Sequence, residues 1–403
     1  MLSGRVKHME ASVTVELTAR VDALQRAGVK ILTLNVGEPD FHTPDHIRYA
    51  AKHAIDDGFT RYTPVAGMYE LREAICRKLL KDNGLDYSPG EILVSTGAKQ
   101  SLINGILSLL DHGDEVILPT PCWVSYREMV KLAGSTPIMV KTREEEGFQL
   151  DLPAIEKAVT KKTKAIIINT PNNPTGAVYN EESLRALGDL AAEHDFFIIA
   201  DEIYEKLIYD KEQHLSIASL SPAVKERTLT INGLSKAYAM TGWRIGYAAG
   251  PGELIKAMGD LQGHMTSGAN SVAQHAGLMA LEGTQEPLHA MRSEFDQRRR
   301  YLVQRLNRMP GIACKNSKGA FYLMPRVSRL FGKTHQGKVI KNSTDLANFL
   351  LEEAQIAVVP GTAFEAPDNI RIAYANSLDT IKEGMDRMEK ALGLLRQGSP
   401  LPL

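Results

Sequence analysis

The sequence is poor in cysteine, and its few cysteines are scattered. Cys76, Cys122 and Cys314 are the only three in 403 residues. An odd number of distant cysteines excludes a disulfide-rich framework and is typical of a reducing compartment, so we expect a cytoplasmic protein. No cysteine pair has metal-ligand spacing, and Pro44 interrupts the pair His42 and His46, so we predict no metal site.

The sequence also lacks an excess of charge of either sign and an apolar N-terminal segment. Its 47 Lys and Arg and 48 Asp and Glu leave a net charge of −1. This balance gives no bulk attraction to nucleic acid or to an anionic membrane, so we expect neither as a partner. Residues 1–18 mix charged and apolar positions, which predicts neither a signal peptide nor a spanning helix. The basic run at residues 298–300 is flanked by Glu294 and Asp296, which favours a solvated helix face.

Short apolar strands alternate with helical patterns along most of the chain. With 43% hydrophobic residues, the chain is long enough for two domains. The strands predicted in the first part are residues 92–94, 115–118, 137–140, 164–168, 196–200, 228–231 and 245–249. Uninterrupted apolar strands that alternate with helices predict an α/β fold, in which helices cover both faces of a mainly parallel sheet.

The two ends of the chain have a different pattern. An amphipathic helix is predicted at residues 14–27, closed by Gly28, and a strand at residues 31–34. A long helix at residues 287–309 leads to a C-terminal lobe. The short strands predicted in that lobe are residues 319–323, 356–361 and 370–374. Arg371 lies within the last of them, where an edge-strand side chain would ordinarily point to water.

The segment at residues 232–247 stands out chemically. The strand before it stops at Asn232-Gly233, which is a turn signal, and Lys236 then follows on irregular backbone. A lone lysine is more often a solvated side chain, but Arg244 follows eight positions later. Glycines at positions 242 and 246 let backbone and ligand approach closely.

Polar and aromatic residues follow several of the other predicted strands. Gly97 precedes a helix predicted at residues 99–110, whose free N–H groups and dipole favour an anion, although such junctions are common in α/β proteins. Trp123 follows a strand, where it could be core or could stack on a planar ring. Asn173 lies in a proline-stiffened loop. Asp201 directly follows an apolar strand, and a buried carboxylate there requires a cationic partner.

Several of these motifs together resemble the class I pyridoxal-phosphate aminotransferases, and most closely the bacterial aspartate aminotransferases with a Gly-(Gly/Ala)-Lys-Gln motif. The resemblance runs from Gly37 to Arg371 with its landmarks in family order. It rests on Gly37-Glu38-Pro39-Asp40-Phe41, Gly97-Ala98-Lys99-Gln100 and Ser235-Lys236 followed by Gly242-Trp243-Arg244-Ile245-Gly246. It implies a fold-type I transferase with a mainly parallel seven-stranded sheet and a smaller α+β domain. We expect residues 1–44 to belong to the small domain, residues 45–290 to form the large cofactor-binding domain, and residues 291–403 to complete the small one.

The same resemblance implies pyridoxal 5'-phosphate as the cofactor. Lys236 would form a Schiff base with its aldehyde, and Asp201 would pair with the ring nitrogen and raise the pKa of the pyridinium. Asn173 and Tyr204 would bond the phenolic oxygen, and Trp123 would stack on the ring. Lys236, Asp201 and Tyr204 are therefore the predicted catalytic residues, with the freed Lys236 amine as general base.

For the cofactor's phosphate, the resemblance implies Arg244 and the backbone of Gly97, Ala98 and Lys99. Tyr62 would reach the phosphate of the neighbouring subunit, which predicts a homodimer. One departure concerns the position three residues before the lysine, where many relatives have a hydroxyl. This chain has Gly233 there, and whether Ser235 replaces the missing contact stays open.

On the substrate side, the resemblance implies that Arg371 grips an α-carboxylate, because a guanidinium binds carboxylates bidentately. Lys99, with hydroxyls of the N-terminal segment, would bind a side-chain carboxylate. The predicted substrate-binding residues are Gly37, Lys99, Trp123, Asn173, Arg371, Ser12 and Thr14. The resemblance thus implies ping-pong transamination between L-aspartate and 2-oxoglutarate. Glu10, where relatives often have lysine, would weaken the handling of bulkier dicarboxylic substrates.

Two alternatives remain open from the sequence, and a third is disfavoured. One is an aminotransferase with another donor (prephenate, aromatic residues or alanine) or a β-lyase of the same fold. Another is a non-catalytic binding module, as in some transcriptional regulators, although nothing basic or helix-turn-helix-like precedes residue 30. An unrelated nucleotide-binding enzyme is disfavoured, because neither a Gly-x-Gly-x-x-Gly turn nor a P-loop follows a strand.

Overall fold

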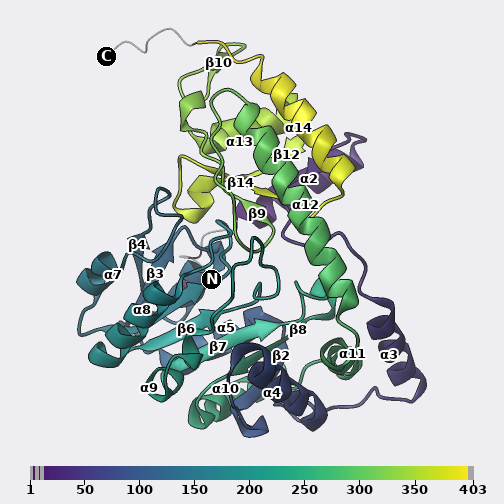
Figure 1. Ribbon diagram of the computed structural model, residues 1–403, viewed down its shortest axis with the longest axis vertical. Helices are drawn as coiled ribbons and strands as arrows, with labels where there is room; N and C mark the ends of the chain where they lie inside the picture. Colours follow the sequence, from purple (N-terminus) through teal and green to yellow (C-terminus); the bar gives the residue numbers. More distant parts are fainter. Residues whose placement is uncertain (1–2, 5–8, 10–12, 398–403) are drawn as a thin grey trace.

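The structure is a computed structural model of the chain and describes residues 3–4, 9 and 13–397. Figure 1 shows a larger lobe, which holds the sheet, and a smaller lobe formed by the C-terminal elements and α2 (Val13–Arg26). The long helix α12 (Glu286–Arg308) runs from one lobe into the other, as the sequence predicted. No helix among these residues is both long enough and apolar enough to span a membrane.

The larger lobe is built on a seven-stranded sheet. Its strands are β2 (Ile92–Thr96), β3 (Glu115–Thr120), β4 (Thr136–Lys141), β5 (Thr163–Asn169), β6 (Phe197–Asp201), β7 (Thr228–Gly233) and β8 (Ile245–Ala249). Their order is β2-β8-β7-β6-β5-β3-β4, and only β8 runs antiparallel to its neighbours. The seven predicted strands and the mainly parallel sheet are therefore confirmed.

Helices cover both faces of this sheet, also as predicted. The helices of the larger lobe are α3 (Asp45–Asp56), α4 (Tyr69–Asn83), α5 (Ala98–Leu109), α6 (Val124–Leu132), α7 (Leu152–Ala158), α8 (Glu181–His194), α9 (Pro222–Lys225), α10 (Gly252–Met265) and α11 (Ser271–Glu282). Because side chains alternate along a strand, Ile198 of β6 packs into the core that includes residues of α7 and α8, and Ile199 into the core that includes residues of α5, α6 and α10. Asp201 has the parity of Ile199, which directs its carboxylate to the α5 and α6 side.

The smaller lobe contains short strands and, besides α2 and part of α12, two further helices among the described residues. Strands β13 (Val359–Pro360), β14 (Ile370–Ala373) and β9 (Tyr322–Leu323) form an antiparallel sheet, and β1 (Leu32–Thr33) pairs in parallel with β12 (Ile356–Ala357). The predictions missed the two-residue strands β10 (Thr334–His335) and β11 (Lys338–Val339), whose mostly polar residues form no apolar run. The other helices are α13 (Ser343–Glu353) and α14 (Leu378–Leu392).

Short 3-10 helices link several of these elements. They are η1 (Pro89–Glu91), η2 (Ile217–Ser219), η3 (Thr241–Trp243), η4 (Ser328–Leu330) and η5 (Gly361–Phe364). Leu34, which follows β1, packs in one core with Phe321, Ile372 and Met385 of the C-terminal part. This long-range packing supports the division that we propose, with residues 1–44 and 291–403 in the small domain and residues 45–290 in the large one.

The prediction of a solvated face at residues 298–300 was wrong for two of its three arginines. Arg298 and Arg299 are buried, and only Arg300 is exposed. Arg299 pairs with Asp210 at 2.7 Å, and Arg298 pairs with Asp40 at 2.6 Å. The local sequence showed only the flanking acids, whereas these partners come from distant segments.

Candidate active site

A cavity of about 590 Å³ lies where the carboxyl ends of β5 and β6 meet α2 and the smaller lobe. Most of the predicted site residues line it, although they are spread over the chain. Those that line it are Gly37, Ala98, Lys99, Trp123, Asn173, Asp201, Tyr204, Lys236, Arg244 and Arg371. Residues of five strand ends or strand-to-helix junctions and of the smaller lobe are thus brought to one place.

Lys236 lies on the turn after β7 and points across the cavity. Its Nζ donates a hydrogen bond to the carbonyl oxygen of Gly37 at 2.7 Å. Burial, opposed by Glu38 and reinforced by the nearby guanidinium groups of Arg244 and Arg371, lowers the pKa of the Lys236 ammonium to about 8. A substantial fraction of the amine is therefore neutral near physiological pH, and the neutral amine is the nucleophilic and proton-accepting form.

Asp201 ends β6 and is buried beside the cavity. Its carboxylate accepts hydrogen bonds from the Tyr126 hydroxyl at 2.6 Å and from the backbone N–H of Ile203 at 3.2 Å. Burial nevertheless raises the pKa of Asp201 to about 6. Among the described residues no Lys, Arg or His forms an ion pair with it, so the expected cationic partner is not a side chain within residues 13–397. A buried carboxylate that borders a cavity without such a partner fits a protonated heterocyclic nitrogen as ligand.

The start of α5 forms an anion-binding corner. Gly97 is the N-cap at a φ of 81°, so the N–H groups of Ala98 and Lys99 belong to the first helical turn, which has no intrahelical acceptors. A Cβ atom on Gly97 would lie 2.4 Å from a guanidinium nitrogen of Arg244, and one on Gly246 would lie 2.1 Å from the nitrogen of Ala98. Both glycines are needed for β8 and Arg244 to approach the helix start this closely.

The open question about positions 233 and 235 gains a physical basis here. Ser235 lines the cavity, whereas Gly233 faces the neighbouring strand. A Cβ atom on Gly233 would lie 2.9 Å from the Cα of Gly246. A hydroxyl-bearing residue at position 233 would therefore crowd β8, and Ser235 is the hydroxyl on this turn that borders the cavity.

The middle of the cavity is aromatic and amide-lined. Trp123 is the N-cap residue of α6, and the Lys99 Nζ lies 4.6 Å from the centroid of its ring. Burial, followed by the charge of Arg244, lowers the pKa of Lys99. Asn173 is held by a hydrogen bond of 2.7 Å from its backbone N–H to the side-chain oxygen of Asn169. These groups provide a flat surface and a fixed amide next to Asp201.

Arg371 supplies a buried cation at the opposite end. Its guanidinium donates to the side-chain oxygen of Asn173 at 3.0 Å and to the carbonyl oxygen of Asn35 at 2.6 Å, while its Nε has no partner. Among the described residues it forms no ion pair with a carboxylate. The alternative of a solvent-facing edge-strand arginine is excluded, because Arg371 is only 4% exposed and β14 is the central strand of its sheet. A buried guanidinium with an unused donor fits a carboxylate ligand.

Two of the other four predicted residues, Tyr62 and Gly97, do not line the cavity, and the other two are Ser12 and Thr14. Tyr62 is 96% exposed, in the loop between α3 and α4, and does not border the cavity of its own chain. Gly97 stands behind Arg244 rather than at the cavity wall. Ser12 lies outside the described residues, and Thr14 belongs to α2, whose residues Val15 and Thr18 line the cavity.

Sequence reasoning missed two phenols and two asparagines of the site. Tyr126 bonds Asp201, Tyr322 bonds Tyr204, and Asn35 and Asn169 fix Arg371 and Asn173. Asn169 directly follows the strand predicted at residues 164–168 and ends β5, which was a usable signal. Tyr126 and Tyr322 gave no signal, because aromatic residues in a helix and in a buried strand usually belong to the core.

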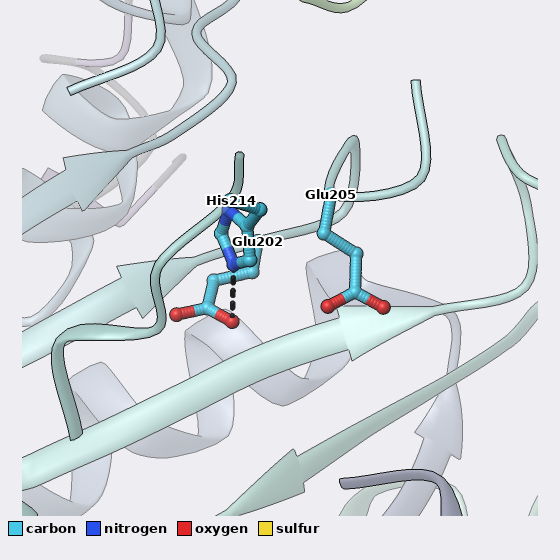
Figure 2. Close-up of side chains that lie close together, drawn as sticks. All are labelled: Glu202, Glu205 and His214. Atoms are coloured by element: carbon cyan, nitrogen blue, oxygen red, sulfur yellow. Dashed lines mark hydrogen bonds and ion pairs between the residues drawn. The ribbon is translucent and has the colours of Figure 1, made fainter. Parts of the chain in front are cut away.

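A second group of ionisable side chains lies on the segment that follows β6. Potential ligand atoms of Glu202, Glu205 and His214 lie within 4.8 Å of one another, and Figure 2 shows His214 bonded to Glu202 with Glu205 beside them. Lys78 of α4 already forms an ion pair with Glu205 and donates to Asn83 at 2.7 Å. Burial opposes ionisation, yet Lys78 lowers the pKa of Glu205 to about 2, and Glu202 raises the pKa of His214. Lys78 already pairs with Glu205 and His214 with Glu202, so the absence of a metal stays our prediction.

Comparisons with known proteins agree with this geometry. The sequence pattern of the family "Aminotransferase class I and II" matches residues 29–388. An aspartate aminotransferase of Geobacillus stearothermophilus is 46% identical over 96% of this chain and 98% of its own, and an aspartate/prephenate aminotransferase of Cereibacter sphaeroides is 46% identical with the same coverage.

Solved structures give the same answer. The crystal structure of the aspartate aminotransferase from Rhizobium meliloti superposes with a TM-score of 0.95 at 41% identity, covering 98% of this chain and 100% of that one. The Thermus thermophilus aspartate aminotransferase with maleate superposes with a TM-score of 0.92 at 42% identity, covering 97% and 99%. The chain therefore belongs to the class I and II aminotransferase family.

Proposed function

We propose that this protein is a pyridoxal-phosphate-dependent aminotransferase that moves an amino group between L-aspartate and 2-oxoglutarate by a ping-pong mechanism. The observation that carries the proposal is one cavity in which Lys236 and Asp201 lie opposite the buried, carboxylate-free Arg371. The names of the relatives support the aspartate donor, because several proteins 43–46% identical to this chain are aspartate aminotransferases.

The residues at the cofactor end fit pyridoxal 5'-phosphate group by group. Asp201 would hold the protonated ring nitrogen, with its carboxylate oriented by Tyr126. Trp123 would stack on the ring, and Asn173 and Tyr204 would bond the phenolic oxygen. When bound, this cofactor supplies an aldehyde that condenses with amines and a ring that withdraws electrons from the reacting carbon.

The anion-binding corner fits the phosphate. The N–H groups of Ala98 and Lys99 at the start of α5, together with the Arg244 guanidinium, provide hydrogen-bond donors and positive charge. We assign to Ser235 the hydroxyl contact that Gly233 cannot make, since only Ser235 borders the cavity. Replacing Ser235 by alanine should weaken cofactor retention without changing the preferred substrate.

Lys236 and Arg371 would carry the substrate chemistry. Arg371 orients the α-carboxylate, which fixes the α-hydrogen relative to the Lys236 amine. The neutral Lys236 amine, whose pKa burial lowers to about 8, would accept the α-proton and release it again. The Gly37 carbonyl oxygen, 2.7 Å from Nζ, holds the amine over the cavity while it carries that proton.

Lys99 would supply the cation that selects a second carboxylate. Its ammonium lies over Trp123 on the cavity wall, and Val15 and Thr18 of α2 line the same cavity. We propose that Ser12 and Thr14 of this N-terminal segment add hydroxyl contacts to the same carboxylate.

A homodimer is part of the proposal. Tyr62 is almost fully exposed in the single chain, which is unusual for a tyrosine and fits a side chain that completes the neighbouring site. Analytical ultracentrifugation should give a dimer, and Tyr62→Phe should weaken cofactor retention while leaving the dimer intact. A fully active monomer would remove this part of the proposal. A cytoplasmic location stays a prediction from the cysteine content.

The decisive experiment is a substrate panel assayed on the cofactor-loaded protein with 2-oxoglutarate as acceptor. We expect the highest kcat/KM for aspartate among aspartate, alanine, phenylalanine and tyrosine. A preference for alanine or an aromatic donor would overturn the aspartate assignment, and no turnover with any donor would favour a binding module. Prephenate belongs in the panel as acceptor, because one relative of 46% identity is an aspartate/prephenate aminotransferase.

A further inference from the structure

Tyr322 of β9 touches three of the residues assigned to the reaction. Its hydroxyl lies 2.8 Å from the hydroxyl of Tyr204, and its ring centroid lies 4.6 Å from the Arg371 guanidinium. A Cβ atom on Gly37 would lie 2.4 Å from the same hydroxyl, so the backbone at Gly37 packs directly against it. Tyr322 is 1% exposed and also lines the cavity.

We propose that Tyr322 is a positioning residue that joins the two ends of the site: its hydroxyl orders the Tyr204 hydroxyl and its ring supports Arg371. This inference rests on the proposed function, because it assigns Tyr322 to the groups that hold the cofactor and the α-carboxylate. Tyr322 belongs to the smaller lobe, and Tyr204 belongs to the larger one.

The hydroxyl pair sets the direction of one proton. Either hydroxyl can be the donor in the pair of Tyr204 and Tyr322. If Tyr204 donates its proton to the phenolic oxygen of the cofactor, its own oxygen can still accept a proton from Tyr322. That order satisfies both buried hydroxyls, whereas the reverse order would leave Tyr204 without a proton for the cofactor.

The ring of Tyr322 is placed by strand pairing. In the β14–β9 ladder Tyr322 stands opposite Ala373, and Arg371 lies two residues from Ala373 on the same face. Arg371 therefore lies diagonally across the ladder from Tyr322, with the Phe364 ring 5.1 Å from its guanidinium as well. Two aromatic rings near a buried guanidinium stabilise its charge without using N–H donors, so those not bonded to Asn173 and Asn35 remain for a carboxylate.

The two roles can be separated by two substitutions. Tyr322→Phe removes the hydroxyl and keeps the ring, whereas Tyr322→Leu removes both. Tyr209→Phe is the matched control, because Tyr209 belongs to the same hydrophobic core and its buried hydroxyl donates to the carbonyl oxygen of Ala320 at 2.6 Å, away from the cavity.

The test uses the full-length protein loaded with pyridoxal 5'-phosphate. Three quantities are measured for each variant: the pH midpoint of the absorbance change of the bound cofactor, the Kd of the unreactive dicarboxylate succinate, and the thermal unfolding midpoint. A hydrogen bond donated to the phenolic oxygen lowers the pKa of the nitrogen that would join the cofactor to Lys236. A weaker hydrogen bond therefore raises the pH midpoint of the absorbance change.

We expect Tyr322→Phe to raise the absorbance midpoint by about 0.5 to 1 pH unit, the size expected from the loss of one hydrogen bond, and to leave the Kd of succinate unchanged. Tyr322→Leu should raise the same midpoint and also weaken succinate binding by about 3- to 30-fold through the lost ring. Tyr209→Phe should lower the unfolding midpoint and leave the absorbance midpoint at the wild-type value.

An absorbance midpoint of Tyr322→Phe equal to that of the wild type would overturn the positioning role, and so would an equal change in Tyr209→Phe. A wild-type protein that takes up no cofactor at all would instead refute the proposed function, and the positioning role with it. The two failures are therefore distinguishable in the same experiment.

Discussion

The cofactor end and the substrate end of the cavity are built in different ways. At the cofactor end, Gly97, Asp201 and Lys236 lie at or just after the carboxyl ends of β2, β6 and β7, so chain order alone brings them to one edge of the sheet. At the substrate end, Arg371 contacts Asn35, which lies 336 positions away in the sequence. The comparison teaches that a site made of strand ends can be recognised locally, whereas one made by contacts between lobes depends on the whole fold.

The largest expected effect comes from the residue that serves both ends. Lys236→Ala should lower kcat by about 100- to 10,000-fold, because the substitution removes the amine that transfers the proton. Lys256→Ala, which removes an exposed lysine paired with Asp260, is the control and should be fully active. The kcat of both variants is measured by steady-state transamination of aspartate. A wild-type kcat in Lys236→Ala would show that Lys236 does not transfer the proton.

The next effect should separate the two ends. Arg371→Ala should lower kcat/KM for every amino acid, with a loss of transition-state stabilisation of about 2–5 kcal/mol, because a buried charged contact is lost. The absorbance spectrum of the bound cofactor should not change. Spectra and kinetics are recorded on the same samples. If the variant no longer retained the cofactor, the two ends would not be independent.

The third effect concerns the cofactor end, where the stability of the cofactor-free protein should depend on pH through Asp201. Burial raises the pKa of Asp201 from 3.8 to about 6. A carboxyl whose pKa is higher in the folded state costs stability once it ionises, so this cost is absent below about pH 4, grows as the pH rises to about 6 and is complete above it. Asp201→Asn should therefore stabilise the cofactor-free protein by up to about 3 kcal/mol at pH 7.5 and by much less at pH 4.5.

Urea unfolding of the cofactor-free variants at the two pH values measures this difference. The exposed Asp260→Asn is the control and should give the same small change at both. A stabilisation by Asp201→Asn that is equal at pH 4.5 and pH 7.5 would show that Asp201 is not buried as a carboxylate.

The smallest expected effect concerns specificity within the substrate end. Lys99→Ala should lower kcat/KM for aspartate, with a loss of transition-state stabilisation of about 1.5–3 kcal/mol, the range for a hydrogen bond to a charged group. The kcat/KM for alanine should change far less. Parallel assays of the two donors give the ratio directly. Equal losses for aspartate and alanine would show that Lys99 does not select the second carboxylate.

The outcome of the sequence predictions follows the same division. All seven strands of the large sheet were predicted, because apolar runs followed by helical periods are a local signal. Strand ends and motifs also predicted that one cavity is lined by Lys236, Asp201, Asn173 and Arg244.

What sequence could not supply depends on contacts between distant segments. Tyr126 and Tyr322 are ordinary aromatic residues until the fold places their hydroxyls beside Asp201 and Tyr204. The burial of Arg299 was missed for the same reason, because its partner Asp210 lies far away in the sequence. A side chain's neighbours across the fold, rather than its own sequence pattern, decide such roles.

The most direct test of the central claim is to fix the cofactor to the protein. The wild-type protein is loaded with pyridoxal 5'-phosphate, reduced with borohydride, digested and analysed by mass spectrometry. The account predicts one modified peptide, carrying the cofactor on Lys236. Modification of another lysine, or no covalent label in a protein that has taken up the cofactor, would contradict it.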